Sequence, residues 1–231
     1  MNRRSRTTDR LERFTALVAY PFPIPTWVIS IDEERYGRFQ KRLGHWSESI
    51  TRWPGVVGKE LQRYTMCATI LDCPSQLTAG EVGCWLSHWQ LWKKAAEQPG
   101  PTVICEDDVN IRPTAGLAQR WLEVWTELQT LPWDVAFLGT QPRNRAVNES
   151  AKVSPSWSRP TRCCGNFLYM VSPGGATKLL RRALPIGRRP VDNFIIDLSL
   201  NDADFRVLCL VPAFGYVIRV VSTTHESSLL E

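Results

Sequence analysis

The sequence lacks any long hydrophobic run. Its first apolar stretch, Phe14–Tyr20, is short, and Pro21, Pro23 and Pro25 interrupt the chain directly after it. A secretory signal needs an apolar core of roughly 7–15 residues, and a transmembrane helix needs about 20 apolar residues. We therefore expect neither a signal peptide nor a membrane span, and we expect a soluble, cytoplasmic protein.

Cysteine motifs for metal or redox chemistry are also missing. The seven cysteines form no C-x-x-C pair, and Cys163 and Cys164 are adjacent, which is poor spacing for one metal ion. Free buried thiols in a reducing compartment account for an odd number of cysteines. We assign no chemistry to them.

The sequence has little local excess of one sign of charge, except at the N-terminus. The net charge is +5, and residues 1–13 carry five arginines against Asp9 and Glu12. Such a cluster either touches nucleic acid or an anionic membrane, or is a frayed, solvated end. We favour the frayed end, treat residues 1–25 as a partly flexible basic extension, and expect no nucleic-acid partner. A weak peripheral membrane contact through these arginines stays open.

The rest of the chain has the composition of a globular domain, with 43% hydrophobic and 22% charged residues among 231. Predicted strands and helices alternate, which favours an α/β fold with a mostly parallel sheet flanked by helices. The strands are expected at 26–31, 50–57, 102–106, 135–138, 167–171 and 207–211. The helices are expected at 33–46, 78–98, 117–128, 174–183 and 191–200.

The predicted strand from Thr102 ends in three consecutive carboxylates, Glu106, Asp107 and Asp108. Adjacent negative charges are costly to bury unless a cation neutralises them, and Mg²⁺ or Mn²⁺ prefers oxygen ligands. Ligands also bind at the carboxyl ends of strands in open α/β sheets. The cluster therefore suggests a metal-assisted site for a phosphate-bearing ligand. The alternative is a solvated turn that caps the next element.

The predicted helix at 78–98 begins with a capping box formed by Thr78 and Glu81. Gly80 and Gly83 are poor helix formers in its first turns, which suggests that backbone room or free N–H groups for an anion are needed there. His88 is either a hydrogen-bonded core residue or faces a ligand. Tryptophans in this helix and the next are either core fillers or a platform for a sugar ring.

The segment from Gly80 to Trp92, G-E-x-G-C-x-x-S-H-x-x-x-W, together with the acidic strand end, resembles glycosyltransferase family 25. That family includes lipooligosaccharide and collagen galactosyltransferases. Further matching motifs lie in the family's order between residues 26 and 200. These are Val28–Asp32 with Arg35 and Arg38, Trp53–Gly58, Trp133–Gly139, Gly165–Ala176 and Pro190–Asp192.

The resemblance implies a single GT-A type domain over residues 26–231, with a Rossmann-like sheet. Residues 26–110 would form the nucleotide-sugar-binding half, and residues 111–231 the acceptor half. A D-x-D-like motif would hold Mn²⁺ or Mg²⁺, which places Asp108 first and Glu106 second as metal ligands. Asp107 would face the ribose or support the metal indirectly. His225 is the candidate for a further ligand, with a solvated tail residue as the alternative.

The resemblance also implies the reaction. A hexose, galactose or glucose, would move from a UDP-sugar to a hydroxyl of a glycan, lipid-linked saccharide or glycoprotein, with inversion. Inversion needs a base, for which Asp192 is the candidate and Asp197 the reserve, although Asp192 could also be a simple helix cap.

Donor contacts are also expected from the same resemblance. The opening segment and the glycine-bearing helix would supply them. The residues concerned are Ile31, Asp32, Arg35, Arg38, Gly83 and His88.

Some features depart from the family pattern. The loop after residue 31 is more acidic than usual, residues 141–164 show no recognisable pattern, and the segment around His225 fits only vaguely. Two other functions stay open. One is a catalytically degenerate protein that binds a nucleotide sugar or glycan, and the other is a metal-dependent phosphoryl-transfer enzyme or nuclease, which would usually draw carboxylates from several elements.

Overall fold

An eight-stranded mixed sheet forms the centre of the structure. The computed structural model describes residues 22–61, 77–111, 116–140, 151–162 and 165–217. In spatial order the strands are β2 (Thr51–Pro54), β1 (Thr26–Ser30), β3 (Thr102–Glu106), β8 (Leu168–Val171), β5 (Val135–Phe137), β9 (Val207–Leu210), β7 (Trp157–Arg159) and β6 (Ala151–Lys152). Only β8 and β7 run against the other strands, so the sheet is mostly parallel.

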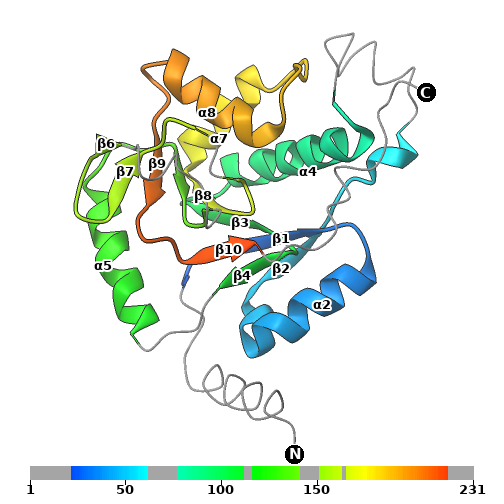
Figure 1. Cartoon of the computed structure of the whole chain (residues 1–231), viewed down its shortest axis with the longest axis horizontal. Helices are drawn as coiled ribbons and strands as arrows, with labels where there is room; N and C mark the ends of the chain where they lie inside the picture. The colour runs from blue at the N-terminus through cyan, green and yellow to red at the C-terminus, as the bar shows by residue number, and fades with distance from the viewer. Residues whose placement is uncertain (1–21, 62–76, 112–115, 141–150, 163–164, 218–231) are drawn as a thin grey trace, which may run out of the picture.

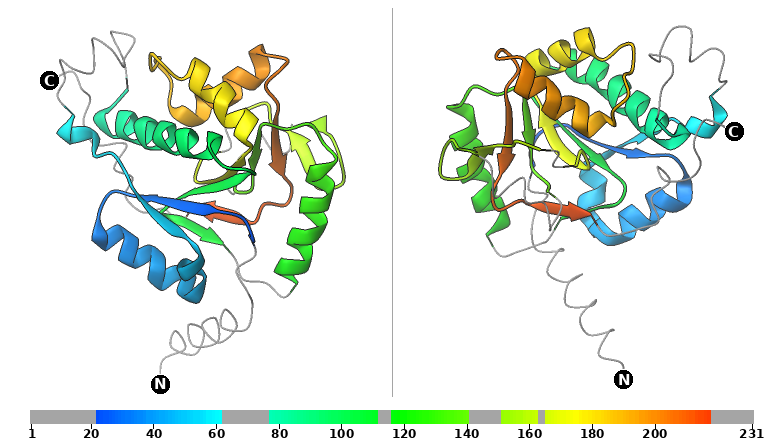
Figure 2. Two further views of the ribbon diagram at one scale, coloured as in Figure 1. Left: turned by 180° about the vertical axis from the view of Figure 1, so that it is seen from behind. Right: turned by 45° about the horizontal axis from the view of Figure 1, so that its top comes forward.

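Helices cover both faces of this sheet (Figures 1 and 2). One face carries α4 (Ala79–Ala96), α7 (Pro173–Arg182) and α8 (Val191–Asn201), and the other carries α2 (Glu33–Leu43) and α5 (Leu117–Gln129). Side chains alternate along each strand. In β3, Ile104 packs into the core beneath α4, whereas Val103 and Cys105 pack into the core beside α2 and α5. This alternation later decides where each acidic residue points.

The predicted α/β class and helix-flanked, mostly parallel sheet are confirmed. The helix expected at 33–46 ends at Leu43, because Gly44 has a φ of 58° and the 3₁₀ helix η1 (Gly44–Ser49) follows. A second short 3₁₀ helix, η2 (Gly58–Glu60), precedes α4. The other expected elements agree with the structure to within three residues at each end.

Four short strands were not expected from the sequence. The chain forms β4 (Val109–Ile111) directly after the acidic cluster, and β4 pairs antiparallel with β10 (Gly215–Val217) in a second, two-stranded sheet. The hairpin of β6 and β7 lies in the stretch where no pattern was recognised. Strands of two or three residues are too short for a periodic signal and are held by their partners.

The capping box predicted for α4 is present: Thr78 accepts from the Glu81 N–H, and Glu81 accepts from the Thr78 N–H. This helix buries Trp85 and Trp92 in the core and leaves Trp89 partly buried, and α5 likewise buries Trp121. Trp85, Trp92 and Trp121 are at most 2% exposed, so these three are core fillers and not a sugar platform.

Within the residues described, no helix has the length and apolar character required to cross a membrane.

Candidate functional site

Three consecutive acidic residues at the end of β3 point in different directions. Glu106 is the last residue of the strand and lies on the same face as Ile104, beneath α4. Asp107, one residue later, turns to the opposite face and meets α2. The two-residue period of a strand accounts for this separation. The triplet is therefore not one cluster of equivalent ligands, because each carboxylate has its own surroundings.

Asp107 is a buried anchor, only 5% exposed. Its carboxylate accepts a hydrogen bond from the Ser30 hydroxyl at 2.7 Å and from Arg35 Nε at 2.8 Å, and a second Arg35 nitrogen also donates to it. Arg42 donates to the backbone carbonyl of Asp107 and, at 3.0 Å, to that of Val109. Two arginines of α2 thus fix the turn that follows β3. The hydrogen bonds from Arg35 to the Asp107 carboxylate, together with its negative charge, raise the pKa of Arg35.

Asp108 has a carboxylate oxygen without a hydrogen-bond partner in the described part of the chain. Its Oδ1 atom is buried and has no hydrogen-bond partner among the residues described. Burial, followed by the charges of Glu106 and Asp107, raises the pKa of Asp108 from its usual 3.8 to about 7. A buried, unpaired carboxylate oxygen is expensive. Together with the nearby negative charges, such an oxygen has the chemistry that a divalent cation prefers in its ligands.

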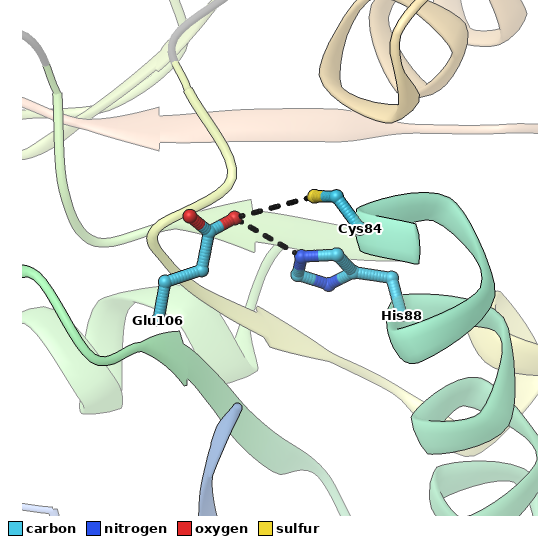
Figure 3. Close-up of side chains that lie close together, drawn as sticks. All are labelled: Cys84, His88 and Glu106. Carbon is cyan, nitrogen blue, oxygen red and sulfur yellow. Dashed lines mark hydrogen bonds and ion pairs between the residues drawn. The ribbon is translucent and has the colours of Figure 1, made fainter. Parts of the chain in front are cut away.

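Glu106 faces α4, where His88 and Cys84 lie one helical turn apart (Figure 3). Its Oε1 atom is 3.1 Å from His88 Nε2 and 3.8 Å from the Cys84 sulfur. The ligand-type atoms of these residues all lie within 4.8 Å of one another. Asn166, just before β8, approaches His88 Nε2 at 2.7 Å. Glu106 keeps 26% of its side chain exposed, so its carboxylate is accessible from outside.

Asp192 lies on the same side of the sheet, in the first turn of α8. Burial raises the pKa of the Cys84 thiol well above its usual range, and the charges of Glu106, Asp192 and Asp108 raise it further. Carboxylates from β3, the following turn and α8 therefore all act on one thiol. Pro190 occupies the helix-cap position, and the Asp192 carboxylate accepts from the next backbone N–H at 2.8 Å. Asp192 is therefore not the cap residue itself.

Asp197 is not brought together with Asp192. Helical residues are about 100° apart, so a spacing of five residues separates these two side chains by roughly 140° around α8. Asp197 pairs with Arg189 at 2.5 Å and lines a hollow of about 300 Å³ whose wall includes Trp85 and Phe194.

The residues expected to contact the donor lie in two places, the segment from Ile31 to Arg38 and the helix α4. Ile31 and Asp32 follow β1, and Asp32 caps α2 by accepting from the Arg35 N–H at 2.7 Å. Arg38 lies on the exposed side of α2 and pairs with Glu34, one turn away. These positions lie beside the Arg35–Asp107 pair, and their roles toward a donor stay predictions.

Gly83 sits where α4 packs against the segment after β2. A Cβ atom there would lie 2.5 Å from the Val56 carbonyl oxygen and 2.8 Å from the Gly58 nitrogen. Ser87 tightens the same contact, because its hydroxyl accepts from the Val56 N–H at 2.8 Å and donates to the Gly83 carbonyl at 2.7 Å. The backbone room inferred from the sequence is thus filled by the protein's own chain, and an anion-binding role of Gly83 stays a prediction.

Sequence reasoning missed several residues of the site. Cys84 was given no chemistry, although its four-residue spacing from His88 placed both on one helix face. Asn166 and Tyr169 contact His88 from β8 and the residues before it, and only tertiary pairing reveals this. His225 lies outside the described residues.

Residues 24–195 match the model of glycosyltransferase family 25 (LPS biosynthesis protein). The chain belongs to glycosyltransferase family 25. The match contains the acidic residues Glu106, Asp107, Asp108 and Asp192, and Asp197 lies just beyond it.

Individual family 25 relatives carry different descriptions. The probable inactive glycosyltransferase 25 family member 3 of Bos taurus is 35% identical over 127 residues, covering 52% of this chain and 20% of the relative. Procollagen galactosyltransferase 1-B of Xenopus laevis is 32% identical over 124 residues, covering 52% and 20%. Human procollagen galactosyltransferase 2 is 30% identical over 124 residues, covering 52% and 19%. This chain spans about a fifth of the length of these relatives.

Proposed function

We propose that this protein is a metal-dependent glycosyltransferase that moves a hexose, galactose or glucose, from a UDP-sugar to a hydroxyl group. The acceptor would be a glycan, a lipid-linked saccharide or a glycoprotein. The observation that carries the proposal is the buried, unpartnered Oδ1 atom of Asp108 beside Glu106, at the end of a central strand. Membership of family 25 and the names of its galactosyltransferase relatives support transfer of a sugar.

The residues present fit a hard divalent cation. Asp108 supplies an unpaired carboxylate oxygen, and Glu106 supplies a partly exposed carboxylate. Carboxylate oxygens are the ligands that Mg²⁺ and Mn²⁺ prefer. When bound, the cation would neutralise the charge that develops on the departing nucleoside diphosphate. Asp107 would hold the turn, because both of its oxygens are already engaged by Ser30 and Arg35.

Asp192 would act as the general base. It approaches the site from α8, on the side of the sheet where Glu106 points. In a displacement with inversion, the acceptor hydroxyl attacks the anomeric carbon while a carboxylate takes its proton. The sugar–phosphate bond breaks on the opposite side, and UDP leaves with the bonding electron pair.

Two observations bear on the alternatives. The relatives include proteins named inactive, which keeps a nucleotide-sugar-binding protein without turnover as the second candidate. A phosphoryl-transfer enzyme with two metal ions would need carboxylates from several elements around one position. Here Asp107 is withdrawn into an ion pair with Arg35, which leaves Glu106 and Asp108 as the pair at the strand end.

The first experiment is calorimetric titration of UDP into the purified protein, with and without Mn²⁺, on the wild type and Asp108→Ala. The proposal predicts binding that requires Mn²⁺ and is lost in the variant. A panel of UDP-sugars, assayed for slow hydrolysis, then identifies the donor. Absence of UDP binding under both conditions contradicts the proposal. Metal-dependent binding without hydrolysis or transfer favours the degenerate protein instead.

A further inference from the structure

A chain of buried hydrogen bonds runs from α4 through β8 to Glu106. Trp92 Nε1 lies 2.9 Å from the Tyr169 hydroxyl oxygen, which in turn lies 2.9 Å from His88 Nδ1. On the far side of the ring, His88 Nε2 lies 3.1 Å from Glu106 Oε1. Trp92, Tyr169 and His88 are fully buried, so bulk water does not compete for these bonds.

The direction of each bond follows from donor chemistry. An indole N–H can only donate, so the Tyr169 oxygen accepts from Trp92. The Tyr169 hydroxyl proton must then go to another acceptor, and in the described part of the chain the other polar atom bonded to this oxygen is His88 Nδ1. Burial raises the pKa of Tyr169 well above its usual range, so the hydroxyl keeps its proton. His88 Nδ1 therefore accepts a hydrogen bond.

A neutral imidazole whose Nδ1 accepts carries its hydrogen on Nε2. That N–H faces the Glu106 carboxylate, an acceptor. The Asn166 atom at 2.7 Å from Nε2 is the amide nitrogen Nδ2, which also lies 3.9 Å from the Cys84 sulfur. Two N–H groups cannot bond to each other, so this tautomer requires the amide to be turned by 180°, with its oxygen toward Nε2; the orientation of an amide is assigned from such a network. The alternative, in which Nε2 binds a soft metal together with Cys84 and Glu106, requires a lone pair on Nε2, and this chain of bonds removes it.

We infer that Trp92 and Tyr169 are positioning residues that hold His88 as the Nε2–H tautomer, and that His88 in turn orients Glu106 toward the cation. The part of the inference that concerns the cation rests on the proposed function. The part that concerns the tautomer of His88 does not. One Glu106 oxygen is held by the imidazole, and the other is left to bind. Removal of a residue that orients a metal ligand typically weakens the metal affinity by about 10–100-fold.

The tautomer is measured directly by long-range ¹H–¹⁵N NMR on protein labelled with ¹⁵N-histidine. The chain has three histidines, so comparison with His45→Gln and His225→Gln identifies the His88 signals. The expected result is a protonated Nε2 and a hydrogen-bonded, unprotonated Nδ1. In Tyr169→Phe the Nδ1 resonance should move toward that of a nitrogen accepting no bond. A protonated Nδ1 in the wild type overturns the inference.

The effect on the cation is measured as Mn²⁺ affinity in the presence of UDP, from the electron paramagnetic resonance of free Mn²⁺. Tyr169→Phe and Trp92→Phe should weaken it by about 10-fold. The matched control is Trp157→Phe, which also removes a buried indole hydrogen bond, to the Val124 carbonyl, on the opposite face of the sheet. Equal loss in the control, or no loss in folded Tyr169→Phe, overturns the positioning role.

The two proposals fail in different ways. If the wild type binds no Mn²⁺ with UDP, the proposed function fails and the cation part of the inference falls with it. The NMR result still decides whether Trp92 and Tyr169 set the tautomer of His88.

Discussion

Arg35 of α2 donates hydrogen bonds from two of its nitrogens to the carboxylate of Asp107, and this ion pair joins α2 to the turn after β3. The pair is largely buried, with 18% and 4% of the two side chains exposed. The family resemblance implied a donor contact for Arg35, and for Asp107 either a contact with the ribose or indirect support of the metal. The geometry gives them a structural task first, because each is the other's main charge partner.

Replacing Arg35 by Met should destabilise the protein strongly. The change leaves the Asp107 carboxylate buried without its cationic partner, and breaking a buried ion pair on one side costs about 3–5 kcal/mol. Arg35→Met with Asp107→Asn should recover part of the loss. Urea unfolding followed by tryptophan fluorescence measures both variants.

The matched control for that experiment is Arg38→Met. Arg38 lies on the same helix, but its pair with Glu34 is exposed, with 47% and 83% of the side chains accessible. Exposed pairs of this kind contribute only about 0.3–0.5 kcal/mol. A loss of equal size in both variants would contradict the anchoring role of the Arg35–Asp107 pair.

Asp108→Asn should stabilise the protein when no divalent cation is added. Burial raises the pKa of Asp108 to about 7, above its usual 3.8, so the folded protein binds this proton more tightly than the unfolded chain does. Stability from this group is therefore present at low pH and lost as pH rises through about 7. The gain in the variant should be larger at pH 8 than at pH 5, by about 1–2 kcal/mol after allowance for solvent relaxation.

Thermal unfolding at the two pH values, with and without Mn²⁺, measures this effect. Added Mn²⁺ should raise the Tm of the wild type and leave that of Asp108→Asn nearly unchanged, because a bound ligand stabilises only the state that binds it. A variant that is less stable than the metal-free wild type at pH 8 would show that Asp108 has a partner after all.

Asp192→Asn should lower kcat by about 10²–10⁴-fold, the usual contribution of a general base, once a donor and an acceptor are identified. UDP–Mn²⁺ affinity should change little, because Asp192 is not assigned to the cation. Asp197→Asn is the control: Asp197 points to another side of α8 and pairs with Arg189. Equal loss of kcat in both variants would remove Asp192 from its role.

Gly83→Ala should destabilise the protein by about 1–3 kcal/mol, as overpacking does. The new methyl group would overlap the Val56 carbonyl and the Gly58 backbone, neither of which can move as a flexible side chain would. In Gly37→Ala, on the open side of α2, the new group meets nothing within 4 Å beyond the neighbouring residues and backbone of its own helix, and better helix propensity should add about 0.5–1 kcal/mol. Differential scanning calorimetry compares the two, and a harmless Gly83→Ala would contradict the close packing.

The sequence by itself determined much of the fold. The capping box at Thr78 and Glu81 is local, since it depends on residues three apart, and the structure contains it. The short apolar run of β3 and the periodicity of α5 are equally local signals, and both elements lie where they were expected. The short strands β4 and β10 carry no such signal, because two segments about a hundred residues apart stabilise each other only after the chain has folded.

The same distinction between local and long-range signals applies to the residues of the site. From the sequence came the acidic triplet, the helix carrying His88 and the position of Asp192 at a helix start, because each is a local pattern of residue types. Only the tertiary structure separated the roles of the three acids. Strand alternation sends Glu106 to His88 and Asp107 to Arg35, and leaves an oxygen of Asp108 buried without a partner. Burial and long-range pairing decide which carboxylate oxygen has a partner and which does not, and neither can be read from the order of neighbouring residues.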